Sequence, residues 1–333
     1  MVESRTKTKL TQAQIGALLG AAFDDATLRS AEELTDGYFN SVYRVEADGR
    51  PPLALKVAPP DDVDVLTYEH GLMRAEVEAM RLVEGDADVP IPRVRFADLS
   101  RTTLPVDFFF MDLVPGTSWT TLRDDLTEAQ NAEIERQLGA ITARVNRVVG
   151  PGFGYLGTGP RFGRWSAALR WMLATLYADA RRFGIESPVP ESELLGAVAR
   201  YSAALDAITE PRLVHWDVWA GNVFGRIDAD GPTVTGVIDF ERALWGDPLM
   251  EFIPSRLGDI AAYEAGYGQP QLATREQRLR RLLYNAYLGL VLVVEDGPRQ
   301  YADKTTVEWG RGLLERAAAM LRHGDVIEAL VKT

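Results

Sequence analysis

The sequence predicts an α+β protein of two lobes, a small β-rich lobe followed by a larger helical lobe. In residues 33–113, several short segments alternate apolar and polar residues with the period of strands, and one longer segment predicts a prominent helix. Pro115 and Gly116 then interrupt the chain, and helical periodicity dominates beyond them. The length of 333 residues fits about two units of ordinary domain size. We therefore expect an N-lobe over residues 1–111, a hinge over 112–116 and a C-lobe over 117–333.

Composition excludes several classes of function. The net charge of −12 argues against sequence-independent nucleic-acid binding, which needs a basic face; the excess suits either solubility or a cationic ligand. The absence of cysteine excludes disulfides, thiolate nucleophiles and zinc–thiolate sites. No apolar run reaches the ~18 residues of a membrane helix, so we expect no membrane association and a cytoplasmic location.

The first lobe begins with a helix rather than a signal peptide. Thr11 and Gln14 form a predicted capping box, which favours an amphipathic helix over residues 11–23. Leu53–Val57 alternates apolar residues with Ala54 and Lys56, the pattern of a half-buried strand. The other elements expected here are a strand–turn–strand over 33–45, a helix over 68–83, and strands over 93–97 and 107–113.

The second lobe is predicted to be mainly helical. Thr127 and Gln130 form another predicted capping box. The helix that they open has one apolar stripe, made of Ile134, Leu138, Ile141, Val145 and Val148. Further helices are expected over 165–183, 191–208 and beyond 248, with a hairpin of strands 223–227 and 234–238 around the turn 228–231.

Four polar residues have a spacing that suits phosphoryl transfer. They are His215, Asp217 and Asn222 on one predicted loop and Asp239 after the hairpin. This reaction needs a carboxylate that orients the attacking hydroxyl and oxygen ligands that hold magnesium against the phosphates. Singly, an Asp or Asn in a turn is commonly a cap, and a His near a strand end is commonly a core residue. The combination is much more specific.

The combination resembles the kinase catalytic loop, and most closely the aminoglycoside phosphotransferase family, the phosphotransferase-enzyme or choline-kinase-like group. Members carry H-G-D-x-x-x-x-N, then I-D-F or I-D-W, then G-D-P. This chain has His215-Trp216-Asp217 with Asn222, then Ile238-Asp239-Phe240, and then Gly246-Asp247-Pro248. The resemblance covers roughly residues 30–255. It implies a protein-kinase-like fold that transfers the γ-phosphoryl group of ATP or GTP to a small-molecule hydroxyl.

The resemblance implies roles for the motif residues. Asp217 would be the catalytic base, Asn222 and Asp239 would bind Mg²⁺, and His215 would fix the loop. In the N-lobe, Lys56 would reach the nucleotide phosphates, as in the V-A-I-K pattern. Glu76 would pair with this lysine, as the first Glu of a run similar to E-x-E-A-L. Glu69 and Glu78 are rival partners, and all three could instead be solvated.

Two further segments resemble nucleotide-binding parts of the family. Gly37, Asn40 and Ser41 fit the phosphate loop G-x-x-N, although a simple hairpin turn fits them as well. In the hinge, the Asp112 carbonyl and the Val114 amide would bond to the adenine edge through main chain, with Met111 beside the pocket.

The chain departs from the family pattern at the catalytic loop. Trp216 replaces the usual Gly, Glu251 stands where Asp is common after G-D-P, and the phosphate loop is poor in glycine. Asp217-Val218-Trp219-Ala220-Gly221-Asn222 resembles the D-L-W-x-G-N of ketoamine kinases. An aromatic wall could stack on a sugar or a cation, or pack in the core. Candidate acceptor residues are Trp216, Trp219, Glu241, Trp245, Glu251, Glu295 and Asp296.

These features together predict a kinase dependent on Mg²⁺ and on ATP or GTP. Its acceptor would be a polar, possibly cationic, hydroxyl compound such as an aminoglycoside or other antibiotic, an amino sugar or an amino alcohol, and antibiotic resistance is one role. A ketoamine (fructosamine-like) kinase and a nucleotide-binding pseudokinase or regulator are alternatives. A protein kinase is disfavoured because Glu241 stands where D-F-G has Gly, and no A-P-E-like segment follows. The acceptor and the oligomeric state stay open.

Overall fold

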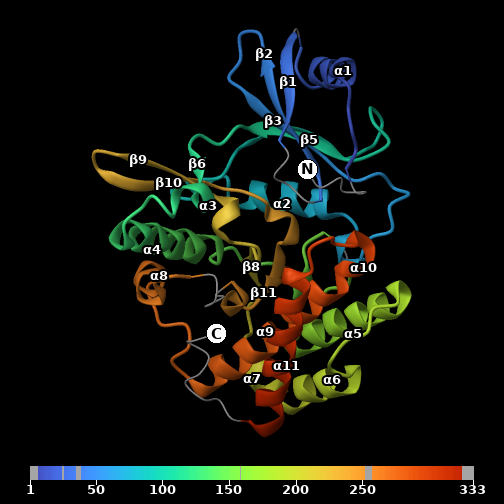
Figure 1. Ribbon diagram of the computed structural model, residues 1–333, viewed down its shortest axis with the longest axis vertical. Helices are drawn as coiled ribbons and strands as arrows, with labels where there is room; N and C mark the ends of the chain where they lie inside the picture. Colours follow the sequence, from blue (N-terminus) through green and yellow to red (C-terminus); the bar gives the residue numbers. More distant parts are fainter. Residues whose placement is uncertain (1–6, 25, 35–38, 158, 252–256, 325–333) are drawn as a thin grey trace.

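The N-lobe is an antiparallel sheet with two helices, seen in a computed structural model that describes residues 7–24, 26–34, 39–157, 159–251 and 257–324. The strand order is β1-β2-β3-β5-β4. Its elements are α1 (Gln12–Ala22), β1 (Leu28–Leu34), β2 (Ser41–Ala47), β3 (Leu53–Val57), α2 (Leu72–Val83), β4 (Val94–Asp98) and β5 (Phe108–Asp112). This sheet and the helical lobe occupy opposite ends of the molecule (Figure 1). The two-lobed α+β prediction is confirmed.

Strand β3 has different partners on its two faces. Leu53, Leu55 and Val57 join the apolar cluster under α1, whereas Ala54 belongs to the cluster that continues into the C-lobe. Because side chains alternate along a strand, Lys56 points to the same side as Ala54. All five residues are buried, Lys56 included at 5% exposure. The strand is thus buried on both faces, not half-buried as predicted, because the second lobe covers its polar face.

Helix α2 starts later than residue 68, where the sequence predicts it. A short 3-10 turn, η1 (Thr67–Glu69), comes first. Gly71 then takes φ 78°, which reverses the chain without a Cβ clash and lets α2 begin at Leu72. Helix α2 packs against η3 (Phe240–Arg242), the turn that follows Asp239. This packing brings a helix of the first lobe to a loop of the second.

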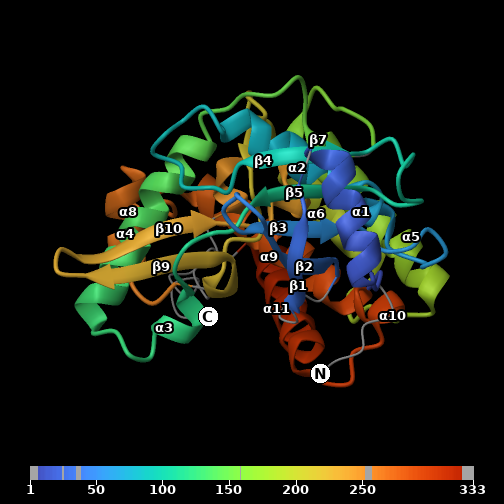
Figure 2. The same cartoon turned by 90° about the horizontal axis from the view of Figure 1, so that it is seen from above.

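The C-lobe is built around α9 (Arg275–Val294), almost all of which is buried. Helix α11 packs along it (Figures 1 and 2). The short strands β7, β11 and β8 form a sheet, and β8 and β11 lie beside α9 in Figure 1. The other elements of this lobe are α3 (Trp119–Leu122), α4 (Glu128–Val145), β7 (Gly154–Tyr155), α5 (Trp165–Phe183), α6 (Glu191–Arg200), α7 (Ser202–Asp206), β8 (Arg212–Val214), β11 (Leu244–Gly246), η4 (Pro248–Met250), α8 (Ile260–Tyr267), α10 (Asp296–Arg299) and α11 (Thr305–His323).

Local signals decided several of these boundaries. The capping boxes predicted at Thr11 and at Thr127 are confirmed, each with its glutamine three residues on. The helix predicted over 191–208 is instead two helices. They meet at Tyr201, whose backbone leaves helical geometry at φ −105° and whose hydroxyl donates to the Leu321 carbonyl at 2.8 Å. The break is accompanied by this contact with α11. Helical periodicity alone does not predict such a break.

A second small sheet ties the segment after residue 116 to the hairpin. Strand β6 (Thr117–Ser118) pairs with β9 (Val223–Asp228), which pairs with β10 (Gly231–Val237). Gly116 takes φ 106°, and a Cβ there would lie 2.4 Å from the Gly225 carbonyl oxygen. Thr235 donates from Oγ1 to the Pro115 carbonyl at 2.5 Å. The chain leaving the N-lobe sheet is therefore fastened to the hairpin that separates Asn222 from Asp239.

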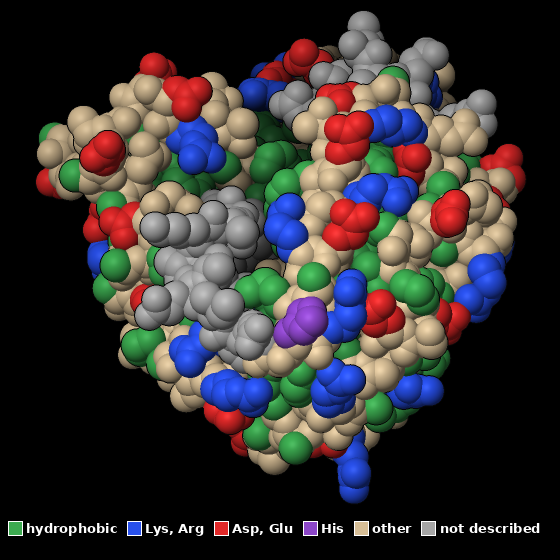
Figure 3. All heavy atoms as spheres, turned by 60° about the horizontal axis from the view of Figure 1, so that its bottom comes forward, with side chains coloured by type: hydrophobic (Ala, Val, Ile, Leu, Met, Phe, Trp, Pro, Cys, Tyr) green, Lys and Arg blue, Asp and Glu red, His purple; other side chains and the backbone are tan. Residues whose placement is uncertain are grey.

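The surface carries both signs of charge. Acidic and basic side chains are interspersed over the face shown in Figure 3, so the acidic excess does not form one field there. Among the described residues, no helix is long and apolar enough to cross a membrane.

Candidate active site

Lys56 is the centre of a buried cluster of charges between the lobes. Its Nζ lies 2.6 Å from Glu76 Oε2 and 2.6 Å from Asp239 Oδ1. Glu76 is 1% exposed on the inner face of α2, whereas its rival Glu78 is exposed and Glu69 pairs with Arg299. Burial alone would lower the pKa of Lys56, but the surrounding carboxylates outweigh it and hold that pKa well above its ordinary value. Lys56 is therefore a permanent cation.

Glu241 is a third carboxylate at the same ammonium group. Its Oε2 lies 3.2 Å from Lys56 Nζ and accepts a hydrogen bond of 2.5 Å from Asn40 Nδ2. The sequence predicts Glu241 as an acceptor residue, but the structure places it with the lysine and with the predicted phosphate loop. One signal was present in the sequence: Glu241 follows Asp239 by two residues, close enough for both to reach a single cation.

The three carboxylates repel one another, and their pKa values reflect this. Burial raises the pKa of Glu76 to about 7, although Lys56 opposes the shift. Burial and the neighbouring Asp239 raise the pKa of Glu241 to about 8. Burial also acts to raise the pKa of Asp239, but Lys56 outweighs it and leaves that pKa below its ordinary value. The cluster thus has more carboxylates than Lys56 alone can neutralise, and a further cation would reduce the repulsion between them.

The loop between β8 and β9 holds Asp217 beside Asn222. Asn222 Nδ2 donates to the Asp217 carbonyl oxygen at 2.9 Å and lies 3.4 Å from its Oδ2. The backbone N–H of Asp217 donates to His215 Nδ1 at 3.2 Å, and His215 Nε2 lies 3.0 Å from the Ile238 carbonyl oxygen. His215 is buried against the Phe240 ring. The histidine therefore bridges the two loops that carry Asp217 and Asp239.

Two residues of this site have left-handed backbone geometry. Trp216 has φ 64° and Asp239 has φ 72°. An L-residue there costs about 1–2 kcal/mol, so surrounding contacts have to hold it. At Trp216 the backbone N–H donates to Glu251, and the ring is buried 4.9 Å from the Tyr287 ring centroid. At Asp239 the side chain is held by Lys56. The glycine usual after this histidine in the family suits the same backbone geometry.

Most of the residues predicted to bind the nucleotide lie within the described part of the chain. Ser41 Oγ is buried and makes no hydrogen bond with any residue that the structure describes, and Asn40 is buried beside it. Gly37 lies outside the described residues. At the hinge, the Asp112 carboxylate pairs with Arg95, and the methyl groups of Val114 fill the space where Gly236 has no Cβ.

The predicted acceptor residues do not gather on one surface. Trp219 is 41% exposed, next to Val218 and near Trp119. Trp245 is instead in the core, where its ring fills the space beside Gly150.

The predicted acceptor carboxylates are engaged in other contacts. Glu251 accepts backbone N–H groups of the catalytic loop. Glu295 is buried in ion pairs with Arg242 and Arg299, and Asp296 pairs with Lys304. Each carboxylate thus has a protein partner, and its role toward an acceptor stays a prediction.

The donors at this site fit a complex of magnesium with nucleotide phosphates. Glu76, Asp239 and Glu241 each present an oxygen within 4.8 Å of the others, and all three oxygens surround the Lys56 ammonium group. Of the three, Asp239 has the most exposed side chain, at 30%, and is therefore the carboxylate placed to take a metal ion as well. Magnesium prefers such hard oxygen ligands and keeps waters and phosphates in its remaining positions. The buried Ser41 hydroxyl is a spare donor on the side of the predicted phosphate loop.

The site can thus do three things chemically. It presents a fixed cation on a strand, a partly exposed carboxylate, Asp239, able to take a metal ion, and a separate carboxylate, Asp217, on a braced loop. These are the components that phosphoryl transfer uses for positioning and for charge stabilisation.

Comparison with solved structures gives the same fold. A Ralstonia eutropha protein provisionally named an aminoglycoside phosphotransferase aligns with this chain with 15% identity and a TM-score of 0.67. The alignment covers 95% of this chain and 99% of that one. A ternary complex of aminoglycoside phosphotransferase APH(4)-Ia with AMP-PNP and hygromycin B aligns at 18% identity and TM-score 0.64, covering 92% and 98%. The GDP and kanamycin complex of APH(2")-IIIa aligns at 18% identity and TM-score 0.62, covering 90% and 97%.

Comparison by sequence identifies the family. No curated protein matches the chain at a significant level. The sequence profile of the phosphotransferase enzyme family, however, matches residues 30–288, which include β2, β3 and α2 with Lys56 and Glu76, both loops of the site, and most of α9. The chain belongs to the phosphotransferase enzyme family.

Proposed function

We propose that this protein is a kinase that transfers the γ-phosphoryl group of ATP or GTP to a hydroxyl of a small molecule. The supporting observation is the double ion pair of Lys56, 2.6 Å from both Glu76 and Asp239. One pair orients the lysine from α2, and the other joins it to the loop that would hold the metal. We place the activity in the cytoplasm.

The proposed chemistry divides between the two lobes. Lys56, Asn40 and Ser41 would bind nucleotide phosphates, and the Asp112 carbonyl and Val114 amide would bind the base. Asn222 and Asp239 would hold Mg²⁺, which when bound offsets phosphate charge. Asp217 would accept a hydrogen bond from the acceptor hydroxyl and orient it for in-line attack. His215 and Glu251 would keep the Asp217 loop in place.

The proposed acceptor is a polar compound with a free hydroxyl, such as an aminoglycoside, an amino sugar or an amino alcohol. Two of the structurally similar enzymes were solved with hygromycin B and kanamycin. The exposed ring of Trp219, two residues after Asp217, offers a flat face to a sugar ring or a cation. This ring also favours a second candidate, a ketoamine kinase.

A coupled assay of nucleoside diphosphate release tests the proposal. The wild-type protein is supplied with Mg-ATP or Mg-GTP and with aminoglycosides, other antibiotics, amino sugars, ketoamines, choline-like alcohols or a protein substrate. We expect turnover with one class of small hydroxyl compound. Turnover with the protein substrate alone, or no rise in melting temperature with either nucleotide, would contradict the proposal.

The Asp217→Ala variant tests whether Asp217 is the catalytic residue. Loss of general-base assistance lowers rates by about 10²–10⁴-fold, while the melting-temperature rise with Mg-nucleotide should persist. Asp230→Ala is the matched control, since Asp230 is an exposed carboxylate on the β9–β10 turn. Near-normal turnover in Asp217→Ala would exclude the proposed mechanism.

A further inference from the structure

A chain of buried ion pairs runs from the N-lobe to the residue that follows the Asp239 loop. Glu69 Oε1 lies 2.5 Å from Arg299 Nη2, and Arg299 Nη1 lies 2.9 Å from Glu295 Oε2. Glu295 Oε1 lies 2.7 Å from Arg242 Nη2. The side chains are 1–12% exposed. Two carboxylates thus neutralise two guanidinium groups inside the protein.

Each part of this chain touches an element of the candidate active site. The Arg299 guanidinium lies 5.6 Å from the ring centroid of Phe39, which precedes Asn40. Glu69 also accepts the Leu66 backbone N–H just before α2. Arg242 lies 5.9 Å from the ring centroid of Trp216, the residue before Asp217. The network therefore reaches the phosphate loop, the entry to α2 and the catalytic loop.

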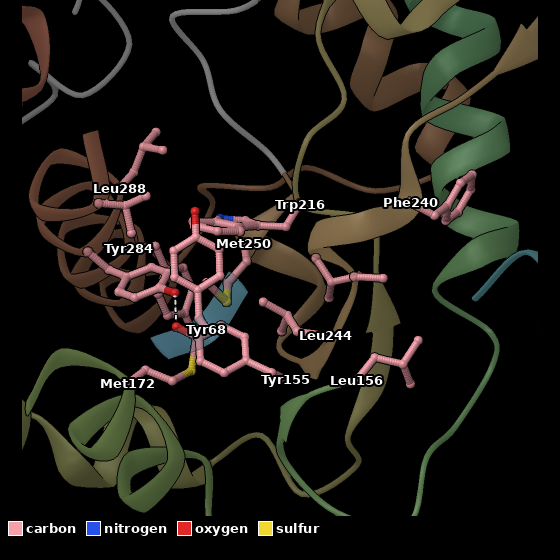
Figure 4. Packing of buried hydrophobic residues seen from close by; sticks show 14 of the residues in the cluster. Tyr68, Tyr155, Leu156, Met172, Trp216, Phe240, Leu244, Met250, Tyr284 and Leu288 are labelled. Atoms are coloured by element: carbon pink, nitrogen blue, oxygen red, sulfur yellow. Dashed lines mark hydrogen bonds between the residues drawn. The ribbon is translucent and has the colours of Figure 1, made fainter. Parts of the chain in front are cut away.

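Aromatic side chains surround the Arg242 end of the network. Tyr68 donates its hydroxyl to Glu295 Oε1 at 2.5 Å and stacks on Tyr155. Tyr68, Tyr155 and Trp216 lie close together in the core between the lobes (Figure 4). A buried ion pair gives little net stability, because desolvation offsets the attraction, but it can fix one geometry. A role in geometry is therefore the physical reading of this network.

Arg242 is also linked electrostatically to the catalytic loop. Its guanidinium makes the 2.7 Å ion pair with Glu295 and also lies over two aromatic rings, 5.9 Å from the Trp216 centroid and 6.0 Å from that of Tyr68. A cation is attracted to the face of such a ring. The charge of Arg242 is thus held by a carboxylate on one side and contacts the residue before Asp217 on the other.

We propose that Arg242 is a positioning residue for phosphoryl transfer: held by Glu295, it fixes Trp216 and therefore Asp217 in the orientation that the reaction needs. Glu295, Arg299 and Glu69 connect the same arginine to η1, the turn that precedes α2. The inference rests on the proposed function and adds to it a residue that neither the motif nor the fold assigns. Arg242 acts through Asp217 and does not itself contact the transferred group.

The test compares Arg242→Gln with a matched arginine elsewhere. Arg144 on α4 makes a 3.1 Å ion pair with Asp86 in the turn after α2, and neither residue belongs to a motif of the site. Both Arg242→Gln and Arg144→Gln remove the guanidinium of an ion pair. We expect Arg242→Gln to lower kcat by about 100-fold, the effect of a misplaced reacting group, with an unchanged nucleotide KM. Arg144→Gln should keep the wild-type kcat, and Arg242→Lys should restore much of the lost rate.

Crystal structures of the two glutamine variants give a readout that needs no acceptor. In Arg242→Gln the segment Trp216–Asp217 should be displaced, and in Arg144→Gln it should keep its position. An undisplaced segment, a wild-type kcat in Arg242→Gln, or an equal loss of kcat in Arg144→Gln would overturn the inference. Absence of nucleotide binding in the wild-type protein would overturn the proposed function instead, and the crystal structures would still decide the role of Arg242.

Discussion

The carboxylate of Glu251 accepts a hydrogen bond of 2.7 Å from the backbone N–H of His215. A second backbone N–H of the loop, that of Trp216, donates to the same carboxylate. Glu251 lies immediately after η4, so the G-D-P segment and the catalytic loop are held by one buried side chain. The family usually has Asp at this position, and this protein has the longer side chain of Glu251 instead.

Glu251→Gln should therefore destabilise the loop. The neutral amide replaces a charged acceptor of two buried N–H groups, those of His215 and Trp216, at a cost of about 1–3 kcal/mol. We expect a lower free energy of unfolding in urea and a lower kcat. Glu264→Gln is the control, because Glu264 also accepts a backbone N–H, that of Gln271, but lies on α8. A wild-type kcat in Glu251→Gln would remove the loop-fixing role.

Trp216→Gly tests whether backbone strain or side-chain packing has the larger effect on stability at this residue. Glycine would relieve about 1–2 kcal/mol at the left-handed backbone, but deleting a buried Trp side chain costs about 3–5 kcal/mol. We expect packing to win, with a net loss of about 2–3 kcal/mol in urea unfolding. Trp216→Phe, which refills part of the space, should lose less. A Trp216→Gly protein as stable as wild type would show that strain dominates at this residue.

Glu76→Gln should weaken the alignment of Lys56. The ammonium would lose one of its two partners at 2.6 Å, and we expect kcat/KM for the nucleotide to fall by about 10–100-fold, the equivalent of 1.4–2.8 kcal/mol. The exposed Glu78 on the same helix supplies the control variant Glu78→Gln, which should behave as wild type. Equal kinetics in the two variants would mean that Glu76 does not orient Lys56.

The pKa of Glu241 predicts a pH dependence of stability. Its pKa is raised to about 8 in the folded protein from 4.5. Between these values the folded state binds more protons than the unfolded state, so the contribution of this group to stability falls as pH rises. Glu241→Gln lacks this slope. Its stability relative to wild type should therefore increase from pH ~5 to pH ~8.5 by at least ~1 kcal/mol.

Urea unfolding of the metal-free and nucleotide-free protein at several pH values measures this difference. Asp230→Asn is the control, because Asp230 is exposed. Parallel stability curves for wild type and Glu241→Gln would contradict the raised pKa.

Much of the fold followed from local signals in the sequence. The capping boxes at Thr11 and Thr127 depend on residues three apart, and the hairpin before Asp239 depends on its turn. The alternation of Leu53–Val57 also put Lys56 on the face opposite the apolar residues under α1. Such features were predictable because short-range geometry decides them.

The contacts that set the roles of individual acidic residues were not predictable in this way. Glu241 meets Lys56 across 185 positions of sequence, and Glu69 meets Arg299 across 230. No periodicity encodes such a pairing, because it depends on how β3 lies against η3 and how η1 lies against α10. The sequence therefore located the motif loops, whereas which carboxylates face the lysine and which brace the catalytic loop emerged only from the structure.

The fastening of residues 115–118 to the β9–β10 hairpin links the surfaces proposed for the base and for the metal. Because Thr117 and Ser118 pair with Gly225 and Phe224, the chain that leaves the hinge is anchored to the strand that follows Asn222. On its other side the hinge continues from β5, whose Asp112 lies opposite Leu53 of the strand that carries Lys56. One hydrogen-bonded frame therefore carries the surfaces proposed for the base, the phosphates and the metal, so a substitution that shifts the hinge should alter metal binding as well as base recognition.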